Sequence, residues 1–326
     1  MFLIENKLTV ELIQFFQENK IINKNEKILE IEKPGEGNMN LVLRIKTNER
    51  SFIVKQSREF VQKYPQILAP IERVEVEAYF YKTIEKNKIL SDKMPRILAF
   101  YPAHYLLVLE DLGNNTDFTF LYQKNHNIAD NEVIELTQYL SELHQIKPLG
   151  YPDNAELKTL NHFHIFDFPF DINNDFDLEQ IQIGLSEIAK PIINDTELKK
   201  RIQFLGEIYL SKGNCLIHGD FYPGSWLKTN DGIKIIDPEF SYLGKPEFDL
   251  GVFMAHLLIA QKKESINTLL VKYQKSFNFD VKLMFGFAGV EIMRRLLGVA
   301  QLPIQLDLAQ KKALLEEAKN LILGKK

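Results

Sequence analysis

Short stretches with a two-residue period dominate the first third of the chain. Residues 41–46 and 51–56 alternate apolar and polar side chains around the polar turn 47–50, which predicts a β-hairpin. Further strands are expected at residues 27–32, 97–101 and 105–110, and helices at 8–19 and 71–86. This part of the chain is therefore expected to form an antiparallel sheet accompanied by helices.

The pattern changes near residue 112, and the remainder of the chain follows a helical period. Amphipathic helices are predicted at residues 131–145, 178–190, 197–212, 248–262, 266–277, 281–302 and 306–323. A polar stretch, residues 113–117, lies at the change. We place a boundary there and predict an α+β fold with two lobes, residues 1–112 and 113–326.

Composition agrees with a soluble globular protein. The chain has 326 residues, a length sufficient for two lobes. Its residues are 45% hydrophobic and 26% charged, a composition typical of a folded protein and not of a disordered one. A net charge of −4 offers no basic surface for nucleic acid. The single cysteine, Cys215, cannot form an internal disulfide, so a reducing cytoplasm is expected. No signal peptide and no membrane-length apolar run are recognised.

The side chains with the clearest chemistry lie between residues 215 and 240. A turn formed by His218, Gly219 and Asp220 precedes a second acidic cluster, Asp237 and Glu239. Phosphoryl transfer needs one carboxylate to accept the proton of the attacking hydroxyl, and others to hold Mg²⁺ on nucleotide phosphates. Asp220 is the candidate proton acceptor, and Asp237 and Glu239 are the candidate metal ligands. Two solvated loop acids are the alternative, but this alternative explains the order and the spacing poorly.

Two neighbours of Asp220 are candidates for supporting roles. His218 is expected to stabilise the loop through hydrogen bonds. Ser225 lies five residues after Asp220, where many kinase loops carry an asparagine metal ligand. A hydroxyl is a poorer ligand, so we expect Ser225 to contact the metal through water.

A loop and a lysine in the N-terminal third are candidates for binding phosphates. Gly35 and Gly37 lie between two predicted strands, where glycine lets backbone N–H groups approach a phosphate. Lys55 lies on a predicted strand, and a lysine there would need a glutamate partner from the helix at 71–86. Glu77 is preferred over Glu75. A plain turn and a solvated lysine are the alternatives.

Two further features have open interpretations. The apolar strand that ends at Glu110 and Leu112 offers backbone groups for the edge of an adenine ring, although it is also an ordinary strand end. Arg294 and Arg295 lie in an otherwise apolar predicted helix, so at least one guanidinium should lie near the buried face. It would need a phosphate, hydroxyls or a carboxylate as partner. An internal ion pair with Glu291 has equal weight.

Together these residues resemble the aminoglycoside phosphotransferase and choline kinase-like superfamily, and within it the S-methyl-5-thioribose kinases. The matching motifs are GEGNMN (35–40), VKQ (54–56), EDL (110–112), HGDFYPGS (218–225), DPEF (237–240), GKPEFDLG (244–251) and MRRLLGVA (293–300). The resemblance spans the chain from about residue 30 to residue 300. It implies a bilobal protein-kinase-like fold, with an antiparallel N-lobe that binds nucleotide and a helical C-lobe that carries catalysis and substrate binding.

The resemblance also implies a role for each matching residue. Asp220 would be the catalytic base, Asp237 and Glu239 would hold Mg²⁺, and Asp249 would support the catalytic loop. The ATP-binding set would be Gly35, Gly37, Asn38, Asn40, Lys55, Glu110 and Leu112. Arg294, Arg295 and Tyr222 would contact the substrate. The implied cofactors are ATP and Mg²⁺, and the implied partner is a small molecule with a hydroxyl group.

Two departures from the family pattern leave the substrate open. Family members are generally longer, and Phe221, Tyr222 and Pro223 replace the usual Leu-His-Thr after the catalytic aspartate. A methylthioribose-like pentose is favoured as substrate. An aminoglycoside or choline-type kinase is the first alternative, although an arginine pair would repel such cations. A degenerate kinase-like binding protein is the second alternative. The sequence leaves the oligomeric state open, including a homodimer.

Overall fold

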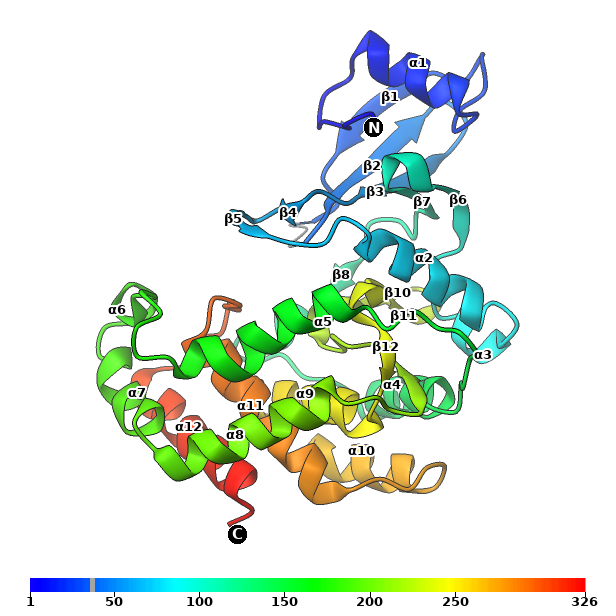
Figure 1. Ribbon diagram of the computed structural model, residues 1–326. Coiled ribbons are helices and arrows are strands. Elements are labelled where there is room, and N and C mark those ends of the chain that lie inside the picture. The colour runs from blue at the N-terminus through cyan, green and yellow to red at the C-terminus, as the bar shows by residue number, and fades with distance from the viewer. Residues whose placement is uncertain (36–38, 326) are drawn as a thin grey trace. The chain divides into compact units, whose positions relative to one another are not determined.

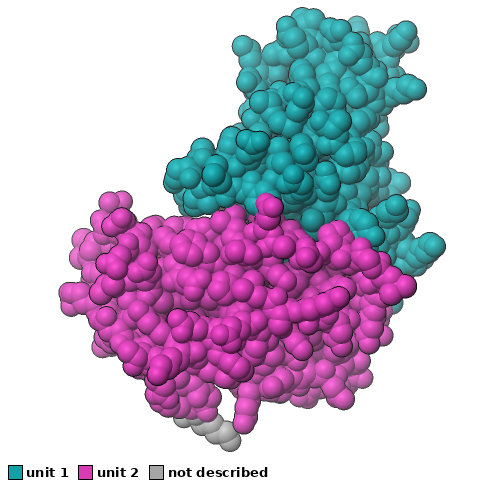
Figure 2. Space-filling view, in the orientation of Figure 1, with its two compact units in different colours: residues 1–116, 234–240 teal, residues 117–233, 241–326 magenta. Residues whose placement is uncertain are grey.

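The computed structural model describes residues 1–35 and 39–325 and divides the chain into two compact units (Figure 2). Unit 1 contains Met1–Thr116 and Lys234–Phe240, and unit 2 contains Asp117–Ile233 and Ser241–Lys326. The first division thus follows Thr116, whereas the sequence pattern placed it after residue 112. The return of Lys234–Phe240 to unit 1 has no local sequence signal. It depends on contacts such as the Ile235 amide, which donates to the Lys93 carbonyl oxygen at 2.7 Å.

An antiparallel five-stranded sheet in the order β1-β2-β3-β7-β6 forms the framework of unit 1 (Figure 1). Its strands are β1 (Ile28–Glu32), β2 (Leu41–Thr47), β3 (Ser51–Gln56), β6 (Ile97–Tyr101) and β7 (Leu106–Glu110). Each predicted strand is present with bounds that differ by a residue or so. The predicted hairpin is confirmed, because β2 and β3 pair from Leu41 opposite Gln56 to Lys46 opposite Ser51.

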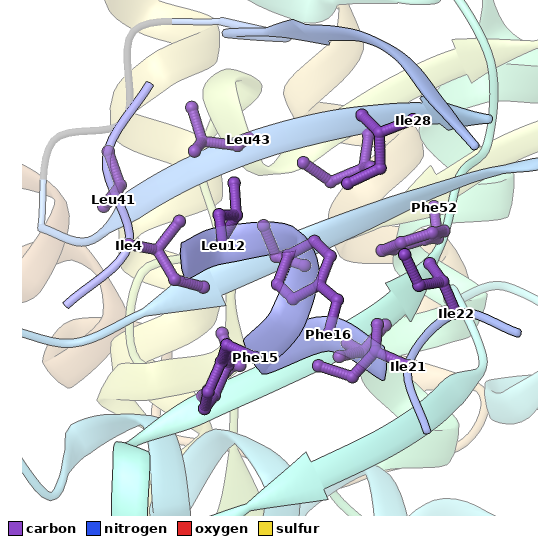
Figure 3. Packing of buried hydrophobic residues seen from close by; sticks show 14 residues of the cluster. Ile4, Leu12, Phe15, Phe16, Ile21, Ile22, Ile28, Leu41, Leu43 and Phe52 are labelled. Atoms are coloured by element: carbon purple, nitrogen blue, oxygen red, sulfur yellow. The ribbon is translucent and has the colours of Figure 1, made fainter. Parts of the chain in front are cut away.

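The two-residue period gives the sheet two different faces. Leu43, Ile45, Phe52 and Val54 are buried on one face, beneath helix α1 (Val10–Glu18) and its Phe16 (Figure 3). Thr9 caps α1 by accepting a hydrogen bond from the Leu12 amide. Lys55 alternates with Val54 and therefore lies on the opposite face. There it meets helix α2 (Arg73–Ile84).

The short elements of unit 1 that have no counterpart in the predicted set include α3 (Lys88–Ser91) and the two-stranded hairpin of β4 (Phe60–Val61) and β5 (Tyr64–Leu68). Pro65 lies inside β5 and cannot donate to a strand ladder, so the sequence pattern gave little support for a strand there. β8 (Thr116–Asp117) and β11 (Gly232–Ile235) lie where the chain passes from one unit to the other.

Unit 2 is mainly helical, as predicted. Its helices are α4 (Asp130–Leu143), α5 (Ala155–His162), α6 (Leu178–Ile181), α7 (Leu185–Ile193), α8 (Thr196–Leu210), α9 (Pro246–Ile259), α10 (Glu264–Gln274), α11 (Val281–Leu297) and α12 (Leu308–Leu323). Every residue of α9 is buried, and α9 packs closely against α11. The short strands β9 (Cys215–Ile217) and β12 (Tyr242–Gly244) pair antiparallel, and β10 (Trp226–Thr229) follows the loop that contains Asp220.

Two helix predictions in unit 2 are wrong in extent. The expected helix at 178–190 is broken into α6 and α7 at Gly184, which has a φ of +85° that interrupts the helical backbone. The expected helix at 281–302 ends at Leu297, since Gly298 adopts an extended backbone as its C-cap. Helix α5 and the π-helical turn Phe163–Asp167 were not predicted, because α5 is short and mostly polar and the aromatic run that follows it lacks a clear helical period.

None of the helices among the described residues combines the length and apolar composition needed to span a membrane.

Candidate active site

Lys55 is the centre of a buried charge cluster in unit 1. Its Nζ lies 2.6 Å from Glu77 Oε2, 2.7 Å from Asp237 Oδ1 and 4.0 Å from Glu239 Oε1, and the residue is 2% exposed. Burial opposes the charge on Lys55, but the nearby carboxylates outweigh burial and raise its pKa. The predicted pair with Glu77 is therefore present, whereas Glu75 lies on the exposed side of α2. The cluster keeps Lys55 protonated and points it at Asp237.

Asp237 combines a strained backbone with an accessible carboxylate. Its φ is +63°, in the left-handed region that residues other than glycine rarely adopt. Its side chain is 47% exposed although it contacts the buried Lys55. Strain of this kind tends to persist where the surrounding structure needs a particular orientation, often at functional sites. Asp237 can therefore hold Lys55 and still offer oxygen atoms to a ligand.

The Glu239 side chain is more buried than the Asp237 side chain. Its Oε2 accepts a hydrogen bond from Asn40 Nδ2 at 2.7 Å, and Arg73 Nε lies 3.6 Å away. Burial raises the pKa of Glu239, and the cations Lys55 and Arg73 act against that rise. Asn40 also accepts from Ser57 Oγ at 2.9 Å. The end of the predicted phosphate loop is thus fixed to the Asp-Pro-Glu segment.

The rest of that loop is only partly described. Gly35 has open space where a Cβ would stand, which suits a close approach by a ligand. Gly37 and Asn38, both predicted to bind phosphate, lie outside the described residues.

Arg73 is a member of this cluster that the sequence pattern did not reveal. It is 1% exposed, and its guanidinium donates to the carbonyl oxygens of Arg58, Pro70, Met39 and Phe60 at 2.7, 2.6, 2.8 and 3.2 Å. Through these bonds Arg73 connects the residue before Asn40 to the β4–β5 region. The sequence shows only one arginine in a charged stretch at the start of a helix, so no local signal could have identified it.

The predicted adenine-binding segment at the end of β7 is held by two arginines. The Glu110 amide donates to the Arg96 carbonyl oxygen at 2.9 Å, and the Glu110 carboxylate pairs with the exposed Arg96 guanidinium at 3.0 Å. Arg44 Nε lies 2.9 Å from Asp111. The Leu112 carbonyl oxygen accepts from Asn115 at 2.6 Å. The segment is therefore ordered, and the role of Glu110 and Leu112 in binding a purine stays a prediction.

The carboxylates of unit 1 fit Mg²⁺ only with help from a ligand. Within the described ranges, no group of three or more His, Cys, Asp or Glu side chains is arranged to hold a metal ion. Mg²⁺ in phosphate sites commonly takes one or two carboxylates and completes its shell with phosphates and water. Asp237 suits this arrangement by its exposure. The metal role of Glu239 stays a prediction, since Asn40 and Arg73 already engage its carboxylate.

In unit 2, Asp249 fixes the turn that carries Asp220. Its carboxylate accepts from the His218 amide at 2.7 Å and the Gly219 amide at 2.9 Å. Gly219 has a φ of +84°, which explains the need for glycine in the middle of the turn. The Ser225 hydroxyl donates to the Asp220 carbonyl oxygen at 2.9 Å. Asp249 therefore bonds to the loop backbone in the way that its predicted supporting role requires, and Ser225 also bonds to the loop. Its metal contact remains a prediction.

The side chain of Asp220 meets both arginines of α11. Its Oδ1 lies 3.2 Å from Arg295 Nη2 and 3.9 Å from Arg294 Nη1. Glu291 pairs with the same arginines at 2.5 and 3.0 Å. Burial opposes the charge on Glu291, but the two guanidinium groups hold its pKa well below the usual range. The arginines thus make the internal ion pair considered from the sequence and also reach Asp220.

Tyr222 supports this group from the loop that follows Asp220. Its ring lies 4.7 Å from the Arg295 guanidinium, within the range of a cation–π contact. The ring folds back over Gly224, where any Cβ would come within 2.4 Å of the Tyr222 hydroxyl. Tyr222 therefore orders Arg295 in this structure, and its contact with a substrate stays a prediction.

Comparison with known proteins gives consistent matches. A model of the family described as "Phosphotransferase enzyme family" matches residues 30–281. The methylthioribose kinase of Exiguobacterium sibiricum is 26% identical over 317 residues, which cover 82% of this chain and 79% of that protein.

Solved structures match the fold at lower sequence identity. The choline kinase LicA from Streptococcus pneumoniae has a TM-score of 0.54 at 12% identity, covering 96% of this chain and 99% of that one. A spectinomycin phosphotransferase in complex with ADP and spectinomycin has a TM-score of 0.55 at 11% identity, covering 98% and 99%. At these identities the likeness establishes the protein-kinase-like arrangement of an antiparallel sheet followed by helices.

Proposed function

The chain belongs to the phosphotransferase enzyme family, and from this premise we propose that it transfers the γ-phosphate of ATP to a hydroxyl group of a small sugar. The observation that carries the proposal is the Lys55–Glu77–Asp237 cluster. A buried lysine held by a helix glutamate and an accessible aspartate is an arrangement suited to nucleotide phosphates.

The residues of unit 1 would bind the nucleotide. Lys55 would neutralise the α- and β-phosphates, and the loop that contains Gly35, Gly37, Asn38 and Asn40 would contact phosphates through its backbone. Glu110 and Leu112 would meet the adenine edge. Since the Glu110 amide already donates to Arg96, its contribution would be its carbonyl oxygen. Asp237 would hold Mg²⁺, with Glu239 beside it and Ser225 through water. Bound Mg²⁺ would neutralise charge on the phosphates.

The residues of unit 2 would position the hydroxyl group. Asp220 would accept its proton, while Asp249 holds the loop backbone and the arginine pair holds the carboxylate. Such a site acts mainly by positioning and charge neutralisation. The roles fit the expectation of a nucleotide-binding first lobe and a catalytic second lobe.

A neutral pentose suits this site better than a cation. Two guanidinium groups lie within 4 Å of Asp220, and an aminoglycoside or a choline would bring further positive charge to them. The match to a methylthioribose kinase supports a methylthioribose-like pentose as the substrate.

The experiment is a product assay with ATP and Mg²⁺ on a panel of pentoses, including methylthioribose, and of amino sugars and choline. We expect phosphorylation of a pentose, with turnover abolished in Asp220→Asn while ATP binding is retained. Phosphorylation of kanamycin or choline alone would reject the sugar assignment. Undiminished turnover by Asp220→Asn would remove Asp220 from its role, and ATP binding without any product would favour a binding protein.

A further inference from the structure

A buried chain of three side chains stands behind the arginine pair. The Tyr122 hydroxyl lies 2.7 Å from His256 Nδ1, and His256 Nε2 lies 3.1 Å from Glu291 Oε1. All three residues are almost completely buried. His256 is a polar residue within an otherwise apolar stretch of α9.

The direction of these hydrogen bonds follows from their surroundings. Burial raises the pKa of Tyr122, so its hydroxyl keeps its proton and donates. Glu291 is ionised between two arginines and can only accept. His256 must therefore carry its proton on Nε2 and accept from Tyr122 at Nδ1. Burial, together with Arg295, also lowers the pKa of His256 against the effect of Glu291, and this keeps the ring neutral.

A second chain of tyrosine, histidine and carboxylate supports the backbone of the loop that carries Asp220. The Tyr273 hydroxyl lies 2.7 Å from His144 Nδ1, and His144 Nε2 lies 3.1 Å from Asp249. Asp249 in turn holds the amides that precede Asp220. Unit 2 thus contains two Tyr–His–carboxylate chains. One ends at the loop backbone, and the other ends at the arginines that contact the Asp220 side chain.

The two arginines differ in how completely they are satisfied. Arg295 donates from Nε to Glu291 at 2.5 Å and from Nη2 to Asp220 at 3.2 Å. Its Nη1 donates to the Ala300 carbonyl oxygen at 3.4 Å, and the Tyr222 ring lies against its plane. Arg295 is therefore held on each nitrogen and on one face.

Arg294 has fewer partners. Its Nη1 donates to Glu291 at 3.0 Å, and its Nη2 reaches Asn161 Oδ1 only at 3.5 Å. Its Nε is buried and has no acceptor among the residues that the structure describes. A buried donor without an acceptor destabilises the structure. An acceptor oxygen of a ligand beside Arg294 would therefore supply the missing hydrogen bond and break few existing ones.

We propose that the two arginines have different tasks. Arg295, braced by Tyr122, His256 and Glu291, is a positioning residue that fixes the Asp220 carboxylate. Arg294 is the arginine that contacts the substrate, through an oxygen of a hydroxylated acceptor. This inference rests on the proposed function and assigns separate steps within it.

Steady-state kinetics with the accepted sugar distinguish the two tasks. Arg295→Lys should lower kcat at least about tenfold and change the KM for the sugar less than about twofold, because ground-state binding is retained. Arg294→Lys should raise that KM at least about fivefold and change kcat less than about threefold. The same pattern of kcat and KM in both variants would overturn the division of tasks.

The brace is tested by removing one oxygen atom. Tyr122→Phe should lower kcat at least about threefold without changing the KM for ATP. Tyr151→Phe is the matched control, since it deletes another buried tyrosine hydroxyl, the one bonded to Ser241 at 2.7 Å. Equal kcat values in the two variants would overturn the brace.

A structural readout separates this inference from the proposed function. If the wild-type protein phosphorylates no hydroxyl compound, the proposed function fails. A crystal structure of Glu291→Gln still decides the brace, because a neutral amide anchors the Arg295 Nε less firmly than a carboxylate, so the distance from Arg295 Nη2 to Asp220 should depart from 3.2 Å. An unchanged contact in that variant would reject the brace, whatever the activity.

Discussion

Lys55 and Asp237 are 182 positions apart in the chain, yet their charged atoms lie 2.7 Å from one another within unit 1. The contact exists because Lys234–Phe240 leaves the helical unit and packs beside the sheet face that carries Lys55. A lysine with a buried glutamate on one side and an exposed aspartate on the other has a fixed position and an accessible end. Stability and nucleotide binding should therefore both depend on Lys55.

Lys55→Met should lower both the stability of the protein and its affinity for ATP. The change leaves Glu77 buried without its nearest cation, which typically lowers the free energy of unfolding by about 3 kcal/mol or more. ATP binding should fall at least about tenfold, because the phosphates lose a direct charge partner. Urea unfolding and calorimetric ATP binding measure the two effects.

A double variant separates stability from binding. Adding Glu77→Leu to Lys55→Met removes the orphaned carboxylate, so it should recover much of the unfolding free energy. ATP binding should stay weak in the double variant. Recovery of both properties together would show that Lys55 acts only through folding.

Asp249→Asn should disturb the loop that carries Asp220. The carboxylate accepts from the His218 and Gly219 amides and from His144, and an amide group would turn a donor toward these donors. We expect a loss of about 3 kcal/mol in unfolding free energy and a large fall in kcat.

The same substitution elsewhere provides a control. Asp280 caps α11 by accepting from the Lys282 and Leu283 amides, and asparagine is an equally good N-cap residue. Asp280→Asn should therefore leave the unfolding free energy nearly unchanged. An equal loss of unfolding free energy in both variants would mean that the hydrogen bonds to Asp249 stabilise the protein no more than those of a helix N-cap.

Local patterns predicted those parts of the fold and site that depend on local chemistry. Alternating residues gave the β2–β3 hairpin, and helical spacing placed Glu75 and Glu77 on different faces of α2, of which the preferred Glu77 meets Lys55. Arg73 could not be found in this way. Its partners are carbonyl oxygens from four separate positions, and a carbonyl group is present in every residue.

The division of the chain shows the same limit. Nothing in the composition of Lys234–Phe240 indicates that it joins unit 1, because its attachment depends on the Lys93 carbonyl oxygen and on Lys55. The break at Gly184 was visible only as a glycine inside an apolar period, which helices tolerate elsewhere. Long-range contacts decided the first case, and the backbone conformation of one glycine decided the second.

Acidic pH should destabilise the protein through His164. Burial, and then the nearby Arg294, lower the pKa of this histidine from 6.5 to about 4. As the pH falls below 6.5, the unfolded chain binds a proton that the folded protein does not bind until about pH 4, so the folded state loses stability. His256, whose pKa burial also lowers, acts in the same direction.

His164→Gln tests this pH dependence. The variant has no titrating group at residue 164, so its unfolding free energy should fall less than that of the wild type between about pH 7 and about pH 4.5. Urea unfolding at both pH values gives the comparison. Parallel losses in the two proteins would show that His164 does not contribute.

Gly251→Ala should separate the two helices that carry the supports of the site. A Cβ at residue 251 of α9 would stand 2.7 Å from the Phe287 Cβ and 2.9 Å from the Met284 carbonyl oxygen of α11, and backbone atoms cannot rotate away. Overpacking of this kind costs about 1–3 kcal/mol. Because α11 also bears Arg294 and Arg295, kcat should fall as well.

Gly35→Ala is the control. An alanine Cβ at residue 35 meets no atom within 4 Å, so the unfolding free energy of this variant should match that of the wild type. An unchanged urea midpoint for Gly251→Ala would mean that α9 and α11 can move apart at little cost, and that their close contact does not position the arginines.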